Sequence, residues 1–565
     1  MTRELGLIMM AIAFSCVVRC DSDNSTGAGR GSDSGGAPDA LSPKEEGGVG
    51  PGTCPSRPER AFDPRRNYVA PALTPTLVVT SAANDGGGSL RQALGTAAPG
   101  AVIGFDPQLA GRTIALDATL TLTKSVTITG AAAPGMTIDA QHHGTAFQYG
   151  SDSPTILKFF ALRIVNGRTT GSGGAISLNG NDVDLEIGGC TFENNAANEG
   201  GALRVGYRRK TASIHDSVFI GNDGAFPGGD RGGFSGGAIS AIGPTLRITR
   251  CRFEANKGVA TGAVYTIHAD PLVEDSVFIG NRSTGASGSG AFFADGGGPG
   301  DYNTDYTNPA NNIPGQITLR RTRFDGNRGA GDDSGAVEAY AYPLDTVTFE
   351  DSVFVDNISD PGRAGAAFIH SDHIVRIART AFVGNRATGV GGAIWADGNG
   401  HYDFENALFS GNVASGDFGG ALRMNITQTA RLRIVSSTFV DNTAGDANGA
   451  MWIAGRRDAR ISNSIFANNT FRGGGQQINF PVDEGGGNIE WPAPLDADKA
   501  LAMARNVDPM LATLAEVRES YARMPGANSP ALRTAVAPSP ATDLFGAIRG
   551  VPADVGAFEA GGHCP

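Results

Sequence analysis

Apolar and polar residues alternate in short stretches along residues 173–469, and the stretches recur mostly every 25 to 30 residues. The pattern Phe-x-x-Asn occurs ten times, and Gly-Gly-Ala-Ile or a close variant of it stands between successive copies. An apolar period of two is typical of β-strands, and glycine and asparagine between such stretches are typical of turns. Strand–turn units that repeat at this interval predict a parallel β-solenoid in which each repeat forms one coil, with the Gly-Gly pairs at tight corners of positive φ.

Equivalent residues of successive coils are expected to form columns, because coils stack about 4.8 Å apart. The motif phenylalanines and asparagines would form two such columns, with the asparagines hydrogen-bonded along theirs. A further column alternates in charge, which predicts ion pairs with a structural role: Asp216, Arg250, Asp275, Arg321, Asp351 and Arg379. Cys190 and Cys251 would share a column about 9.6 Å apart, too far for a disulfide, which predicts free buried thiols.

The combination of Gly-Gly-Ala-(Ile, Leu or Val) with Phe-x-x-Asn resembles the repeat of chlamydial polymorphic outer membrane proteins, a class of bacterial surface β-helix proteins. The stretch "LVVTSAANDGGGSLRQAL" resembles the opening of secreted right-handed β-helix proteins, in which "SLRQAL" would form a short helix over the first coil. The last residues, from "DPMLATL" to "GAFEAG", are similar to the C-terminal segment of choice-of-anchor β-helix proteins. The resemblance implies a right-handed helix, capped ends and a cell-surface setting, and it implies no catalytic residues.

We therefore predict an all-β fold, a single-stranded right-handed parallel β-helix with terminal caps. The predicted N-terminal cap and first coils occupy residues 76–165, the repeat β-helix residues 166–480, and the C-terminal capping segment residues 481–565. Residues 21–75 are polar and rich in glycine and serine, which is typical of a flexible linker. Residues 1–20 contain a short charged start and an apolar core, which predicts an export signal.

The cysteines at the two ends of the chain bear on attachment. Cys16 and Cys20 both follow the apolar core in sequences that look like imperfect lipoprotein cleavage boxes, so either is a candidate for lipidation. The alternative is a plain signal peptide with incidental cysteines. Cys54 and Cys564 flank the folded part, and export would permit a disulfide between them. We expect an exported protein, at the cell surface or outer membrane or released, with membrane contact only through a lipid anchor.

Composition excludes several other functions. The net charge is −12 and no basic stripe is present, so nucleic acid is not an expected partner. No Cys-x-x-Cys pattern or Cys/His cluster indicates a metal site, and no cofactor is expected. We expect a monomer.

The candidate binding face lies on the strands that follow each Gly-Gly-Ala. Because successive side chains of a strand point to opposite faces, the second and fourth residues after the alanine are expected to face solvent. Aromatic rings with neighbouring acids and amides suit pyranose rings, so we predict a face that binds a polysaccharide or cell-surface glycan. Its aromatic residues are Phe293, Tyr340, Phe368, Trp395 and Trp452. The alternative is that these aromatics are structural and that the insertion at 294–316 folds over them.

An enzyme using the same face is the second hypothesis, either a polysaccharide lyase or a glycoside hydrolase. Its candidate catalytic residues are Glu338, His370, Asp397 and Arg423. Glu338 and Asp397 are two coils apart and could approach the roughly 6.5–9.5 Å separation of an inverting carboxyl pair. Calcium is a candidate cofactor only if the protein is a lyase. Whether these four side chains converge on one point is the observation that discriminates between the two hypotheses.

Overall fold

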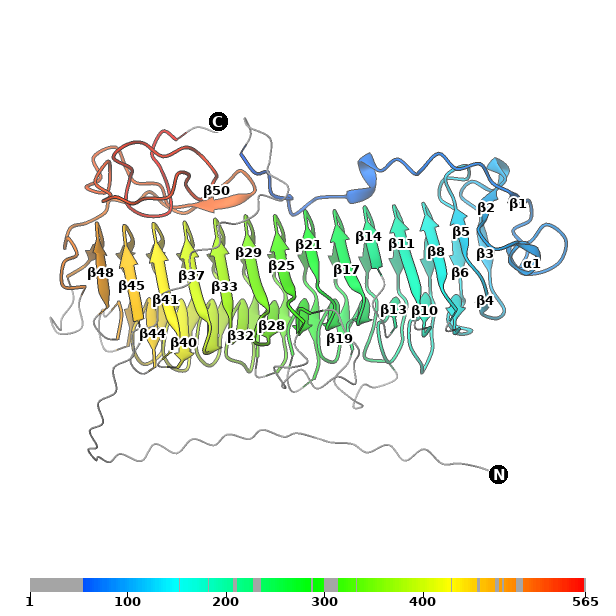
Figure 1. Cartoon of the computed structure of the whole chain (residues 1–565), viewed down its shortest axis with the longest axis horizontal. Coiled ribbons are helices and arrows are strands. Elements are labelled where there is room, and N and C mark those ends of the chain that lie inside the picture. The colour runs from blue at the N-terminus through cyan, green and yellow to red at the C-terminus, as the bar shows by residue number, and fades with distance from the viewer. Residues whose placement is uncertain are drawn as a thin grey trace, which may run out of the picture. The chain divides into compact units, whose positions relative to one another are not determined.

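The computed structural model describes residues 54–562 except 152, 181, 207–210, 227–234, 286–287, 299–312, 332, 428, 455–457, 473–476, 480–481 and 494–500. These residues form a right-handed parallel β-helix, which confirms the predicted fold class (Figure 1). Four parallel sheets of 15, 14, 12 and 8 strands run along it, and they are called here sheets A, B, C and D. The later repeat coils pass through A, B, D and C in turn, and the earlier coils pass through A, B and C.

The strands of each sheet are neighbours in space but come from successive coils. Sheet A consists of β1 (Leu77–Val79), β2 (Ala101–Phe105), β5 (Val126–Thr129), β8 (Thr155–Phe160), β11 (Val183–Gly188), β14 (Thr211–His215), β17 (Thr245–Thr249), β21 (Leu272–Glu274), β25 (Gln316–Arg320), β29 (Thr346–Glu350), β33 (Ile374–Ala378), β37 (His401–Glu405), β41 (Arg431–Val435), β45 (Asp458–Ser462) and β48 (Asp483–Gly486). Sheet B consists of β3 (Thr113–Ala115), β6 (Thr137–Asp139), β9 (Arg163–Val165), β12 (Thr191–Glu193), β15 (Val218–Ile220), β18 (Arg252–Glu254), β22 (Val277–Ile279), β26 (Arg323–Asp325), β30 (Val353–Val355), β34 (Ala381–Val383), β38 (Leu408–Ser410), β42 (Thr438–Val440), β46 (Ile465–Ala467) and β49 (Ile489–Trp491).

Sheet C, which carries the candidate face, consists of β4 (Leu120–Leu122), β7 (Phe147–Tyr149), β10 (Ile176–Leu178), β13 (Leu203–Val205), β16 (Ile239–Ile242), β20 (Val264–Ile267), β24 (Phe292–Asp295), β28 (Val337–Ala341), β32 (Ala367–Ser371), β36 (Ile394–Gly398), β40 (Leu422–Ile426) and β44 (Met451–Ile453). Sheet D consists of the short strands β19 (Lys257–Gly258), β23 (Arg282–Ser283), β27 (Arg328–Gly329), β31 (Ile358–Ser359), β35 (Arg386–Ala387), β39 (Val413–Ala414), β43 (Thr443–Ala444) and β47 (Thr470–Phe471). The remaining elements are η1 (Pro64–Asn67), α1 (Leu90–Thr96), η2 (Pro107–Leu109) and the antiparallel pair β50 (Ala515–Val517) and β51 (Ser520–Ala522).

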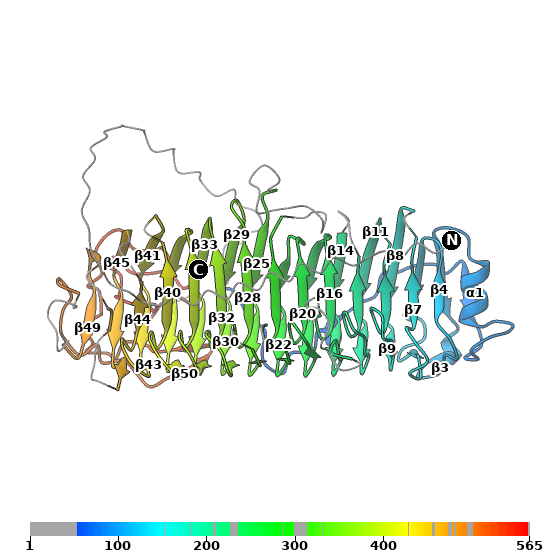
Figure 2. The same cartoon turned by 90° about the horizontal axis from the view of Figure 1, so that it is seen from below.

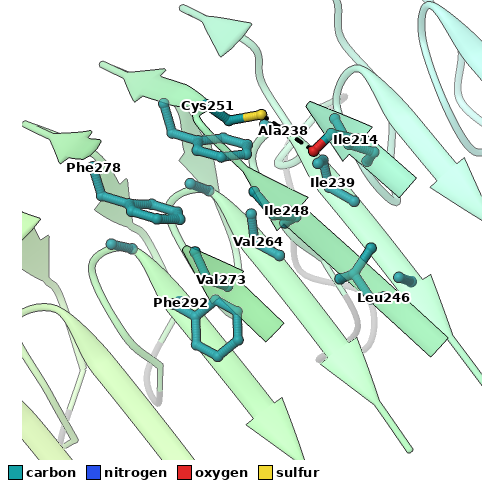
Figure 3. Packing of buried hydrophobic residues seen from close by; sticks show 14 of the residues in the cluster. Ile214, Ala238, Ile239, Leu246, Ile248, Cys251, Val264, Val273, Phe278 and Phe292 are labelled. Atoms are coloured by element: carbon teal, nitrogen blue, oxygen red, sulfur yellow. Dashed lines mark hydrogen bonds between the residues drawn. The ribbon is translucent and has the colours of Figure 1, made fainter. Parts of the chain in front are cut away.

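The predicted phenylalanine column is present and forms the inward side of sheet B. Its ten rings, from Phe192 to Phe466, stack with centroids 4.6 to 4.9 Å apart and with planes within 14° of parallel. Aliphatic residues of sheets A and C fill the rest of the interior, and Figure 3 shows Ile248, Val264 and Val273 beside Phe278. The inward residues predicted from the apolar period of two are therefore confirmed.

The asparagine column is also confirmed, and every member described is fully buried. Asn385 illustrates the bonding: its Oδ1 accepts from the main-chain N and the Nδ2 of Asn357, at 3.1 and 2.9 Å. Its own Nδ2 donates to Asn412 Oδ1 at 3.0 Å and to the Phe354 carbonyl at 2.9 Å. The buried amides thus satisfy one another and the main chain of the corner between sheets B and D.

The Gly-Gly pairs show the expected positive φ at their first glycine in four coils, and their second glycine has a further role. A positive φ is found at the first glycine in some coils, as at Gly173 and Gly391, but not at the second glycine of the pair. At the second position a β-carbon would meet the main chain of the next coil, as at Gly365, where the Gly392 carbonyl oxygen would lie only 1.9 Å away. Glycine is therefore needed there for close approach of two backbones rather than for a left-handed turn.

The alternating charges pair across coils at the corner between sheets A and B. Arg250 donates to Asp216 at 2.7 and 2.8 Å, and Arg321 donates to Asp275 at 2.6 and 3.0 Å. Arg379 and Asp351 form a third pair. All six residues adopt a positive φ of 46° to 51°, so the pairs hold a strained corner and the predicted structural role is confirmed.

Cys190 and Cys251 are free and buried, as predicted. The Cys251 thiol donates to the Ile214 carbonyl at 3.5 Å (Figure 3). Burial raises the pKa of both thiols to about 12, so neither forms a thiolate near neutral pH.

We expect both thiols to resist alkylation by iodoacetamide at pH 8 in the native protein and to react after denaturation, because the thiolate is the reactive species. Mass spectrometry of the peptides that contain Cys190 and Cys251 measures this directly. Modification of either cysteine in the native protein at the rate of a free thiol would contradict the structure.

The first coil is capped as the sequence predicts. Helix α1 begins after Ser89, whose Oγ accepts a hydrogen bond from the Gln92 main-chain N at 3.2 Å. Leu90, Ala93 and Leu94 are buried against the first strands, so the helix closes this end of the core.

Residues 54–70, called here the N-terminal strap, lie against the solenoid although their composition predicts a flexible linker. The Arg57 side chain is buried and donates to the carbonyls of Arg379 and Leu544, both at 2.8 Å. Further along, Arg65 donates to Thr191 at 3.0 Å. The strap therefore follows the corner between sheets A and B from the coil of Arg379 toward the first coils (Figure 1).

Residues 511–562, called here the C-terminal strap, cover the side of the solenoid rather than only its end. Their apolar residues Ala522, Ala531, Leu544, Phe545, Val555, Ala557 and Phe558 pack on the outer face of sheet B, on residues of β30, β34, β38, β42, β46 and β49. Cys54 is disulfide-bonded, and its expected partner Cys564 lies outside the described residues. The pairing of these two cysteines stays a prediction, as does lipidation of Cys16 or Cys20, which also lie outside.

Candidate functional site

The candidate face is the outer side of sheet C, where two rows of outward positions run across the coils. The first outer row is Tyr265, Phe293, Glu338, Phe368, Trp395, Arg423 and Trp452. The second outer row, two residues further along each strand, is Ile267, Asp295, Tyr340, His370, Asp397 and Asn425. The strands that carry them lie side by side in Figure 2, so neighbouring members of a row are one coil apart.

The first outer row is not the exposed strip that the sequence predicts. Phe368 is 3% exposed and Trp395 8%, while Phe293 and Trp452 are half-buried. The rings of Phe368 and Trp395 stack with centroids 4.4 Å apart, and they pack with Ala364 and Val390. The prediction of solvent exposure is therefore wrong for these two, because the glycine-rich turns that lead into sheet C lie over its outer face.

Arg363 completes this cover. Its guanidinium lies 4.4 Å from the centre of the Trp395 ring and pairs with Asp333 at 3.3 Å. The sequence also predicts, as an alternative, that the insertion at 294–316 folds over the aromatic residues. Most of this insertion lies outside the described residues, so that part of the alternative stays a prediction. Phe368 and Trp395 thus stabilise the turns. A ligand on this face would contact the turns and the neighbouring strand residues rather than these two rings.

Glu338 lies in the first outer row between Phe293 and Phe368, and it is 2% exposed. The Tyr340 ring lies close by, with its centroid 6.0 Å from that of Phe293 and 5.4 Å from that of Phe368. Burial, and then the Asp333 charge, raise the pKa of Glu338 well above its ordinary value. Glu338 is therefore a covered carboxyl group whose charged form is disfavoured, and a polymer on the surface does not reach it.

His370 and Asp397 form the one close pair among the four candidate catalytic residues. His370 Nδ1 lies 2.6 Å from Asp397 Oδ1, and their side chains are 37% and 23% exposed. The hydrogen bond to Asp397 raises the pKa of His370, and burial opposes it. The pair presents an imidazole that is oriented by a carboxylate and still reaches solvent.

We expect Asp397→Asn to lower the pKa of His370, because the hydrogen bond and the charge of the carboxylate are lost while burial remains. In the wild type the pair stabilises the fold fully below the unfolded pKa of about 6.5, and this contribution is lost as the pH rises through the raised folded pKa. Histidine-selective NMR titration, with His370→Gln to assign the resonance, measures the shift. An unchanged pKa in Asp397→Asn would contradict the assignment.

Arg423 is turned away from this pair and toward the end of sheet C. Its guanidinium lies 3.3 Å from the centre of the Trp452 ring and 5.5 Å from that of Phe418. Burial lowers its pKa to about 10, against the attraction of Asp417. Of the four candidates, then, the structure brings together only His370 and Asp397.

Sequence reasoning missed Phe418, Asp417 and Arg363, which come from turns rather than strands. Phe418 in "GDFGG" is the one aromatic residue three positions before a repeat alanine, which was a signal that something packs there. Among the described residues, no group of three or more histidines, cysteines or carboxylates is arranged to hold a metal ion. No helix in the described part is long and apolar enough to cross a membrane.

Comparison with known proteins gives one partial similarity. The chain is 38% identical over 96 residues to the probable autotransporter YfaL of Escherichia coli (strain K12). The aligned part is 16% of this chain and 8% of that protein, so the chain spans only a small fraction of its relative's length. No protein-family model matches the chain.

Proposed function

We propose that this chain is an exported surface protein that binds glycans along the outer face of sheet C. The surface location is supported by the partial similarity to a protein named a probable autotransporter and by the apolar N-terminal residues typical of an export signal.

The observation that carries the binding role is the second outer row. Tyr340, His370, Asp397 and Asn425 stand on four successive coils, and each reaches solvent to some degree. They offer a hydroxyl, an imidazole, a carboxylate and an amide, which are groups that hydrogen-bond sugar hydroxyls. The packed first outer row lies beside them on the same strands and keeps their spacing rigid. A rigid binding face loses less conformational entropy when a ligand binds.

Binding is favoured over polysaccharide cleavage because the candidate catalytic groups do not converge. Glu338 is buried beside Tyr340 and Arg423 is stacked on Trp452, which leaves one carboxylate and one imidazole in contact. An inverting hydrolase needs two accessible carboxyl groups across the scissile bond.

The test is a glycan array probed with the full chain and with the double variant His370→Ala/Asn425→Ala. We expect the wild type to retain a defined set of glycans and the double variant to lose at least about tenfold in affinity, the loss of one to two good hydrogen bonds. Ile156→Ala, at a half-exposed position on the outer face of sheet A, is the matched control and should bind as the wild type does. Equal binding by the double variant, or no glycan bound by the wild type, would contradict the proposal.

A further inference from the structure

The guanidinium of Arg423 is held on an aromatic platform at the end of sheet C. Trp452 and Phe418 stack with centroids 5.1 Å apart and planes 18° from parallel, and Arg423 lies over Trp452. A guanidinium that stacks through its face keeps its N–H groups in its own plane, where they can reach a planar acceptor. The platform therefore fixes the orientation of Arg423 before any ligand arrives.

Arg423 has no carboxylate within ion-pair distance in the described part of the chain. Arg204 holds the equivalent strand position two coils before Tyr265 and pairs with Glu199 at 2.9 Å, so the position itself does not prevent pairing. In Arg423 the Nη1 atom is buried and has no hydrogen-bond acceptor. An unpaired buried donor costs free energy, and burial lowers the pKa of Arg423 to about 10. A ligand carboxylate at the part of the guanidinium that reaches solvent would favour the charged form of Arg423.

We propose that Arg423, Trp452 and Phe418 form a subsite for a carboxylate-bearing sugar, either a uronic acid or a sialic acid, within the glycan of the proposed function. The carboxylate accepts two hydrogen bonds from the guanidinium, which is the bidentate geometry that arginine favours. Asn425 is exposed two residues along the same strand and faces the same side, so its amide is placed to bond a hydroxyl of the sugar ring. Because the whole chain carries a net charge of −12, attraction of an acidic glycan must come from such a local site.

The inference rests on the proposed function. Matched acidic and neutral probes test the acidic-sugar subsite separately from glycan binding itself. Polygalacturonate is compared with its carboxyl-reduced product, and sialyllactose is compared with lactose, by surface-based binding to the full chain. The two pairs distinguish a uronic from a sialic acid. We expect at least one acidic member to bind about tenfold or more tightly than its neutral partner, as hydrogen bonds to charged groups warrant.

Arg423→Gln should abolish this preference, so that the acidic and the neutral partner bind with similar affinity. Arg423→Lys keeps the charge but loses the planar fork and should keep only part of the preference, which guards against loss of folding in the glutamine variant. Arg376→Gln removes an exposed arginine from the outer face of sheet A and should change nothing.

Three outcomes would overturn the inference. A wild type that binds acidic and neutral partners equally removes the acidic-sugar subsite while the proposed function stands. An acidic preference that survives Arg423→Gln places it elsewhere on the chain. Failure of the wild type to bind any probe here or any glycan on the array removes the inference and the proposed function together.

Discussion

Gly365→Ala is expected to destabilise the solenoid by about 3 kcal/mol or more, the upper range for overpacking. The new β-carbon would lie 1.9 Å from the Gly392 carbonyl oxygen and 2.6 Å from the Arg386 main-chain N. Both neighbours are backbone atoms of the next coil, so relief requires two coils to separate and their ladder hydrogen bonds to lengthen. The melting temperature and hydrogen exchange in β31, β32, β35 and β36 measure the effect.

Gly95→Ala is the matched control for this prediction. Gly95 lies in α1, and a β-carbon there would have no atom within 4 Å. Alanine should leave the melting temperature unchanged or raise it slightly, because it is the better helix former. Equal melting temperatures for Gly365→Ala and the wild type would show that the coils are not packed as closely as described.

Asn385→Ala is expected to cost about 3 kcal/mol or more as well, for a different reason. The substitution removes the oxygen that accepts from the main-chain N and Nδ2 of Asn357, and it removes the donor to the Phe354 carbonyl. Each buried polar group left without a partner costs about 1–3 kcal/mol. Chemical denaturation should show an earlier first transition, since the coils on either side lose their connection.

Asn425→Ala is the control, because Asn425 is exposed on the outer face of sheet C. A change within about 0.5 kcal/mol is expected there, as for surface substitutions generally. If Asn385→Ala were equally mild, water would be able to enter the corner between sheets B and D, and the buried ladder would contribute little.

The columns of the interior could be predicted from the sequence because a solenoid repeats one environment in every coil. Phe354, Asn357 and Ile377 each recur at fixed spacing, and the period of two decides which residues point inward. The same alternation says which residues point away from the core, but it does not say what lies over them. Trp395 points outward as expected and is buried all the same, because the turn carrying Arg363 and Ala364 folds back over it.

The straps were missed for a related reason, since residues 54–70 and 511–562 carry no repeat from which to place them. A signal was nevertheless present in sheet B. From β30 onward its outward residues are mostly apolar, as in Val353, Val355 and Leu408, and solvent-facing strand positions seldom are. An apolar outer face on a solenoid predicts a covering segment, although not which one.

The path of the N-terminal strap determines how the solenoid is presented if it is held from its N-terminal side. The chain joins the folded part through Arg57, at the coil of Asp351 and Arg379, which is part-way along the solenoid rather than at its first coil. That corner, between sheets A and B, lies across the coil from sheet C (Figures 1 and 2). A force applied to the N-terminal residues would thus act on the middle coils, perpendicular to the solenoid axis. It would not separate coils one by one from the end. It would also turn the rows of sheet C away from the anchoring surface, toward whatever approaches from outside.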